Sequence, residues 1–183
     1  MASLPNPKTV TYEEWLRMPE TKCEEVVNGE IRIMPAPKLM HARVARKLGI
    51  VIGRQVDERE VIIVDSAVDF IIRLQPLTVR QPDLAVLHAA SLVERDGRVH
   101  SAPQLIAEVL SASNTRREIA ARLADFAGLG VPEVWILSYD ARTVEVLYLE
   151  NGQFVRHAIL AEGILKPKLF PDVQIDIAEI WPD

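Results

Sequence analysis

The sequence has a single cysteine, Cys23, among its 183 residues. One thiol cannot form an internal disulfide, and it excludes a zinc site built from several cysteines. No apolar run reaches the length that a membrane span requires. The first ten residues contain two prolines and no apolar stretch, so they do not resemble a secretion signal. We therefore expect a cytoplasmic protein without a membrane partner.

An excess of positive charge is also missing. The formal net charge is -5, and the calculated isoelectric point is about 5.5. Proteins that bind nucleic acids tightly and without sequence preference usually have a basic surface, and this composition does not predict one. A local groove can still be basic while the remaining surface is acidic, so DNA binding stays open at this level.

Two common kinds of site are absent from the sequence. The glycines form no phosphate-binding motif of the type GxxxxGK(S/T), which argues against nucleoside triphosphate hydrolysis. The histidines at 88, 100 and 157 lack the mutual spacing of zinc ligands, so we expect no zinc site.

The sequence does contain enough apolar residues for a substantial core, at 49% of the chain. Its length fits one domain covering residues 1–183. Periodicity predicts helices at 11–18, 38–57 and 115–127, and strands at 25–27, 31–34, 61–64, 68–74, 83–87, 105–110, 134–137, 144–149 and 154–159. Asn28-Gly29 and Asn151-Gly152 are strong signals for tight hairpin turns. We therefore predict an α/β fold, a mixed sheet flanked by helices, with β-hairpins near both ends.

Two carboxylates lie in or beside apolar strands. Asp83 begins one predicted strand and Glu108 interrupts another, where an isolated charge would destabilise the fold. If they met, they would suit Mg²⁺, which prefers oxygen ligands and often takes one or two protein carboxylates. Spacing alone favours a structural role, in which Asp83 caps a strand end and Glu108 pairs with an arginine such as Arg80.

Several segments, in the same order along the chain, resemble the bacterial putative restriction endonuclease family with the PD-(D/E)XK nuclease fold. The resemblance extends over roughly residues 11–149. The segments are Glu25-Val26-Val27-Asn28-Gly29-Glu30, Met40-His41, Gln81-Pro82-Asp83, Ala102-Pro103 through Glu108-Val109-Leu110-Ser111-Ala112-Ser113, and the stretch from Ala127 to Trp135.

The resemblance implies a nuclease that uses Mg²⁺ or Mn²⁺ and acts on DNA, with Asp83 and Glu108 as metal ligands and Glu25 as a supporting acid. The family usually places a lysine on the following helix, and the aligned position here is Arg122. Arginine stays protonated, so Arg122 would position the scissile phosphate or stabilise its charge rather than remove a proton. A helical pair between Arg122 and Glu118 is the alternative interpretation.

Other features leave alternatives open. His41 suits either a phosphate contact or a helix cap, and Thr115-Arg116-Arg117 suits either a DNA backbone contact or an exposed helix start. The apolar C-terminal residues would cover the core, and a homodimer is also open. The arginine at the lysine position leaves a second function open, a nuclease-fold domain that no longer cleaves and serves in nucleic-acid binding or assembly.

Overall fold

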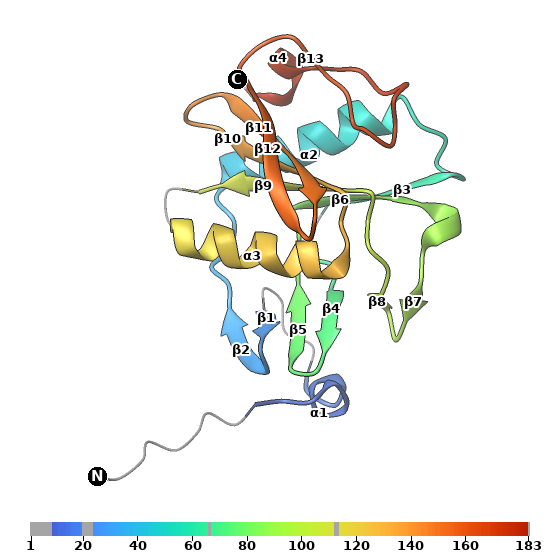
Figure 1. Cartoon of the computed structure of the whole chain (residues 1–183), viewed down its shortest axis with the longest axis vertical. Coiled ribbons are helices and arrows are strands. Elements are labelled where there is room, and N and C mark those ends of the chain that lie inside the picture. Colours follow the sequence, from blue (N-terminus) through green and yellow to red (C-terminus); the bar gives the residue numbers. More distant parts are fainter. Residues whose placement is uncertain (1–8, 20–23, 66, 112–113, 183) are drawn as a thin grey trace.

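A computed structural model describes residues 9–19, 24–65, 67–111 and 114–182. Within these ranges the chain forms two six-stranded sheets, a small two-stranded sheet and a set of helices (Figure 1). The helices are α1 (Tyr12–Leu16), α2 (Leu39–Gly53), α3 (Arg116–Leu129), α4 (Ile177–Ile180) and a short 3-10 helix (Ala89–Ser91). Cys23, Ala112 and Ser113 lie outside the described residues.

The central sheet has the strand order β12-β11-β10-β9-β6-β3. Its strands are β3 (Val61–Val64), β6 (Leu84–His88), β9 (Leu105–Leu110), β10 (Glu133–Ser138), β11 (Thr143–Glu150) and β12 (Gln153–Leu160). β9 and β10 are parallel, whereas β6 and β9 are antiparallel. The middle strands are buried on both faces, as their apolar sequences predict.

Helices cover both faces of this sheet (Figure 1). On one face, Val44 and Leu48 of α2 pack with Leu84, Leu105 and the C-terminal segment. On the other face, Phe126 of α3 packs with a separate set of apolar side chains from the same strands. The starts of α2 and α3 thus approach the sheet from opposite sides.

The second sheet has the order β2-β1-β5-β4-β8-β7. Its strands are β1 (Glu24–Val27), β2 (Glu30–Ile33), β4 (Phe70–Leu74), β5 (Leu77–Arg80), β7 (Glu94–Arg95) and β8 (Arg98–Val99). In the β1–β2 turn, Asn28 and Gly29 have φ values of 53° and 82°, as the Asn-Gly signal predicts. A Cβ atom on Gly29 would lie 2.6 Å from Cβ of Thr9, so glycine also serves this close approach.

The predicted fold class is confirmed, but some elements differ from the prediction. The strand β5 is absent from the prediction because it is only four residues long and lies between two prolines, Pro76 and Pro82. The pair β7–β8 has two residues per strand, too few for a periodic signal. The helix α2 ends at Gly53 rather than near residue 57, and Asp83 lies just before β6 rather than within it.

The C-terminal segment divides between core and surface. Phe170, Ile180 and Trp181 are buried against the central sheet and α2, whereas Ile159 and Ile164 are exposed. The small sheet pairs β13 (Ile164–Leu165) with β14 (Ile175–Asp176). The segment therefore covers the core as predicted, and the homodimer and the single domain stay predictions.

Among the described residues, no helix combines the length and apolar character that crossing a membrane would require.

Candidate active site

Asp83 and Glu108 are brought together by the pairing of β6 with β9. The antiparallel register places Leu84 opposite Ala107, so the next pair of positions is Asp83 and Glu108. Asp83 Oδ2 accepts a hydrogen bond from the backbone amide of Val109 at 2.8 Å, which ties the acidic residue to the neighbouring strand. The sequence alone could not show this meeting, because it depends on which strands are neighbours.

Both carboxylates line one cavity of about 560 Å³. The cavity lies between the first turns of α2 and α3 and the segment that connects β2 to α2, which run close together in Figure 1. Glu25, His41 and Arg122 line it too, so every predicted site residue contributes to the same hollow. The Asp83 and Glu108 side chains are 21% and 13% exposed, so solvent and solutes have access to them.

Arg122 on α3 binds Glu108 through two parallel hydrogen bonds. Arg122 Nε lies 3.0 Å from Glu108 Oε2, and Arg122 Nη2 lies 2.8 Å from Glu108 Oε1. Arg122 Nη1 donates to Glu25 Oε1 at 2.6 Å, and Nη2 also donates to the backbone oxygen of Gln81 at 3.0 Å. A guanidinium has five N–H donors, and these bonds engage four of them. One donor on Nη1 therefore has no partner among the described residues.

Glu25 is enclosed by cations and is only 1% exposed. Its Oε2 accepts a hydrogen bond from Arg80 at 2.7 Å, and its Oε1 accepts one from the Gln81 amide at 2.9 Å in addition to the bond from Arg122. Arg80 in turn binds Asp125 of α3 with bonds of 2.9 and 2.6 Å to Oδ2. Together, Glu25, Arg80, Asp125, Arg122 and Glu108 form a continuous network, here called the ion-pair network.

The pKa values of the network differ because the local charge differs. Burial alone raises the pKa of Glu25, but Arg122, the Gln81 amide and Arg80 outweigh it, so the pKa is lowered. Burial, together with nearby Asp83, raises the pKa of Glu108 to about 7, although Arg122 acts in the opposite direction. At Glu108 burial outweighs the single guanidinium, whereas at Glu25 two guanidinium groups and one backbone amide outweigh burial.

His41, near the start of α2, contacts the other acidic residue. Its Nε2 lies 3.0 Å from Asp83 Oδ2, and this hydrogen bond, opposed by burial, raises the pKa of the imidazole. Its Nδ1 is buried and has no hydrogen-bond partner among the described residues. His41 therefore binds the site residue Asp83, and the N-cap of α2 is Lys38.

The donor set suits a hydrated Mg²⁺ or Mn²⁺ ion better than zinc. Asp83 Oδ1 has no hydrogen-bond partner within the described part of the chain, and each Glu108 oxygen keeps a lone pair beyond its bond to Arg122. A cation between Asp83 and Glu108 would offset the burial and the neighbouring negative charge that raise the pKa of Glu108. Within the described ranges, no group of three or more histidine, cysteine, aspartate or glutamate side chains has the arrangement of a metal site. The ligands would thus be two carboxylates and water, which Mg²⁺ accepts.

Of the two alternative pairings from the sequence, one is confirmed in kind and the other is wrong. Glu108 does pair with an arginine, but this is Arg122 and not Arg80, which binds Glu25 and Asp125 instead. Glu118 does not pair with Arg122, because its carboxylate binds the backbone amide and hydroxyl of Thr115 as a helix cap. Asp125 was not among the predicted site residues, because its partner Arg80 is 45 residues away in the chain and no local spacing indicates the pair.

The basic residues at the start of α3 belong to an exposed first turn. Thr115 is the N-cap, with Glu118 completing a capping box, and Arg116 and Arg117 are exposed. Just before this turn, the Ser111 hydroxyl donates a hydrogen bond to Asn114 Oδ1 at 2.9 Å.

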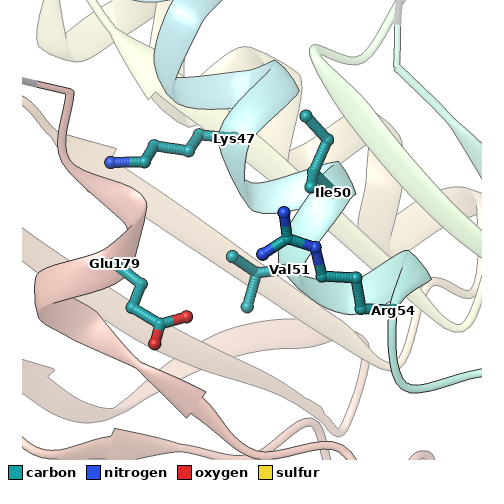
Figure 2. A pocket seen from close by; sticks show the side chains of 5 residues that line it. All are labelled: Lys47, Ile50, Val51, Arg54 and Glu179. Atoms are coloured by element: carbon teal, nitrogen blue, oxygen red, sulfur yellow. The ribbon is translucent and has the colours of Figure 1, made fainter.

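A second hollow of about 330 Å³ lies between α2 and α4 (Figure 2). Lys47 and Arg54 of α2 and Glu179 of α4 extend toward it. It shares no lining residue with the acidic cavity, and Lys47 Nζ donates to the backbone oxygen of Trp181 at 2.9 Å. Its one acid and two cations give it no resemblance to a metal site.

Comparison with known proteins identifies the family. The model of the Uma2 family, described as putative restriction endonucleases, matches residues 10–178. A crystal structure of a putative nuclease of the DUF820 group from Anabaena variabilis has a similar fold, with a TM-score of 0.76 and 19% sequence identity, covering 93% of this chain and 97% of that chain. No curated protein matches the sequence. The chain belongs to the Uma2 family of putative restriction endonucleases.

Proposed function

We propose that this protein is an endonuclease that hydrolyses DNA phosphodiester bonds with the aid of Mg²⁺ or Mn²⁺. The observation that carries the proposal is that Asp83 and Glu108, both partly exposed, line one cavity beside the guanidinium of Arg122. Family membership supports it, since the family is described as putative restriction endonucleases.

Asp83 and Glu108 would hold the metal ion. When bound, such an ion supplies a Lewis acid for the phosphoryl oxygen and lowers the pKa of water. Asp83 is kept in place by the Val109 amide and by His41. Glu108 is kept in place by the fork of Arg122, so neither carboxylate needs to reorganise before substrate arrives.

Arg122 and Glu25 have supporting roles in this proposal. Four of the five N–H donors of Arg122 hold Glu108, Glu25 and the Gln81 oxygen, and the remaining donor on Nη1 would contact the scissile phosphate. Because the guanidinium stays protonated, it would stabilise charge and not accept a proton. Glu25 fixes the position of Arg122 and does not reach the substrate itself, since it is 1% exposed.

Cleavage by an Asp83→Ala variant tests the proposal. We expect wild-type protein to cleave DNA with Mg²⁺ or Mn²⁺ and to be inactive with EDTA, and we expect Asp83→Ala and Asp83→Asn to be inactive while remaining folded by circular dichroism. Asp140→Ala is the matched control, because Asp140 is exposed and does not line the cavity. Equal cleavage by wild type and Asp83→Ala would refute the proposed site.

A second function is favoured by one feature of the same site. Arg122 binds both oxygens of Glu108 and competes with a metal ion for them, which suits a nuclease-fold domain that no longer cleaves and serves in nucleic-acid binding or assembly. A ligand that binds the native state raises the melting temperature. The absence of any shift with Mg²⁺ or Mn²⁺, combined with cleavage gained by Arg122→Lys, would support this second function over the first.

A further inference from the structure

The segment between β2 and α2 exposes apolar side chains at the mouth of the acidic cavity. We call residues 33–39 the apolar lip. Ile33 is 80% exposed and Leu39 is 73% exposed, the two highest values among the exposed large hydrophobic residues. Pro35 and Pro37 restrict the backbone between them, so the lip has few alternative conformations.

The exposure of the lip does nothing for the stability of the fold. Burying either Ile33 or Leu39 would be favourable, yet both face solvent. Other exposed apolar residues, such as Val155 and Ile159 of β12, lie away from the cavity and do not line it. Ile33, by contrast, lines the cavity that contains Asp83, as do Pro35 and Pro37, and Leu39 directly follows the lining residue Lys38 without lining the cavity itself. Exposed apolar surface beside a functional hollow usually marks a binding surface.

Cationic side chains are interleaved with the apolar ones. Arg32 directly precedes the lip, Lys38 belongs to it, and both line the same cavity. Arg32 has a side chain that is 52% exposed, and its pairing with Glu30 is long, at 3.9 Å. Positive charge therefore lies at the rim, whereas Asp83 and Glu108 lie within the cavity. This order suits a phosphate chain that is held at the rim and bends inward to the acids.

Apolar side chains that reach into nucleic acid do so between or against bases. Wedges of isoleucine, leucine, methionine or proline insert at base steps, and pockets hold unstacked bases between apolar side chains. Paired and stacked bases resist this contact, because the stack must first be opened. The cavity of about 560 Å³ is large enough to admit an unstacked nucleotide but too small for a duplex.

We infer that the apolar lip binds unstacked bases, so that the substrate class of this protein is DNA containing unpaired nucleotides rather than intact duplex. The inference deepens the proposed function, since it names the substrate of that same site. Arg32 and Lys38 hold the flanking phosphates, and Ile33 and Leu39 contact the bases.

Binding measurements test the inference separately from cleavage. Fluorescence anisotropy in EDTA would compare an intact duplex, the same duplex with a five-nucleotide single-stranded gap, and the gap strand alone. We expect wild type to bind the gapped and single-stranded DNA on the order of tenfold more tightly than the duplex. The double variant Ile33→Ser/Leu39→Ser should lose that preference. Val155→Ser/Ile159→Ser, which removes two exposed apolar residues elsewhere, should keep it.

A third variant separates charge from stacking. Lys38→Ala should weaken binding to all three DNAs by a similar factor and reduce the salt dependence, because a phosphate contact does not distinguish paired from unpaired bases.

Equal affinity of wild type for all three DNAs would overturn the inference, and so would an unchanged preference in Ile33→Ser/Leu39→Ser. A tighter complex with RNA of the same sequence would overturn the commitment to DNA. Selective binding without cleavage would leave the inference standing and refute the proposed function. Cleavage of intact duplex at the same rate as gapped DNA would support the proposed function and refute the inference about unpaired nucleotides.

Discussion

Two buried glutamates of this protein, Glu25 and Glu133, are equally buried, but their pKa values are shifted in opposite directions. Each is 1% exposed. Glu25 binds Arg80, Arg122 and one backbone amide. Glu133, at the start of β10, accepts hydrogen bonds from Trp135 Nε1 and from the Lys168 backbone amide, both at 2.7 Å. Burial raises the pKa of Glu133, whereas the two guanidinium groups reverse that effect at Glu25 and lower its pKa.

The comparison separates two uses of a buried acid. At Glu133 the uncharged donors satisfy the carboxylate and join β10 to the C-terminal segment, which is a structural task. At Glu25 the charges form a chain that ends at Glu108 in the accessible cavity. A buried ionic network adds little net stability over an apolar one, but it holds charged groups in fixed positions. Fixed charge is what a catalytic site needs.

The largest effect is expected from removing Arg122, the cation that joins Glu25 to Glu108. Arg122→Leu leaves Glu108 without its guanidinium and Glu25 with one arginine instead of two. Breaking a buried ion pair from one side destabilises a protein by about 3–5 kcal/mol. Urea unfolding at pH 7 measures this loss. Arg156→Leu, which removes an arginine that is 60% exposed and paired with Glu145, should change stability by about 0–1 kcal/mol. Equal losses would remove the contrast between network and surface.

A smaller effect is expected from neutralising each glutamate. Glu25→Gln keeps the shape but leaves two buried arginines short of an anion, and we expect a loss of about 3 kcal/mol. Glu133→Gln keeps an oxygen for the Trp135 indole or the Lys168 amide, and we expect a change of about 1 kcal/mol or less. Thermal and urea unfolding at pH 7 compare the two variants. Similar losses would mean that Glu133 depends on charge as Glu25 does.

The smallest effect is a difference in pH dependence. Because the pKa of Glu25 is lowered, its carboxylate stabilises the fold above the ordinary value of 4.5, and that contribution is lost as the pH falls below 4.5. Because the pKa of Glu133 is raised, its carboxylate opposes folding, and stability is gained as the pH falls through the raised pKa toward 4.5.

Unfolding free energies at intervals from pH 7 to pH 4 would show the two effects. The difference between wild type and Glu133→Gln should shift in favour of wild type as the pH falls to 4.5, with a control at pH 8 where neither acid titrates. The difference between wild type and Glu25→Gln should shrink as the pH falls below 4.5, where Glu25 of the wild type becomes protonated. Parallel curves for the two variants would contradict the opposite pKa directions.

Much of the fold could be predicted from local sequence. The Asn28-Gly29 turn and the strand Leu105–Leu110 depend on neighbours within a few residues, and both appear as predicted. The strand β5 was not predicted, since its pairing with β1 and β4 decides its conformation more than its own four residues do.

The candidate site, too, was partly predictable from the sequence and partly decided by the tertiary structure. The chain itself determined which acids were unusual, because Asp83 and Glu108 stand beside or within apolar strands, and it determined that an arginine occupies position 122. Only the tertiary structure decided that β6 lies beside β9, that Arg122 spans from Glu108 to Glu25, and that Arg80 binds Asp125. The reason is physical: patterns of apolar residues report burial, which is local, whereas the partner of a charge depends on strand order and helix packing across tens of residues.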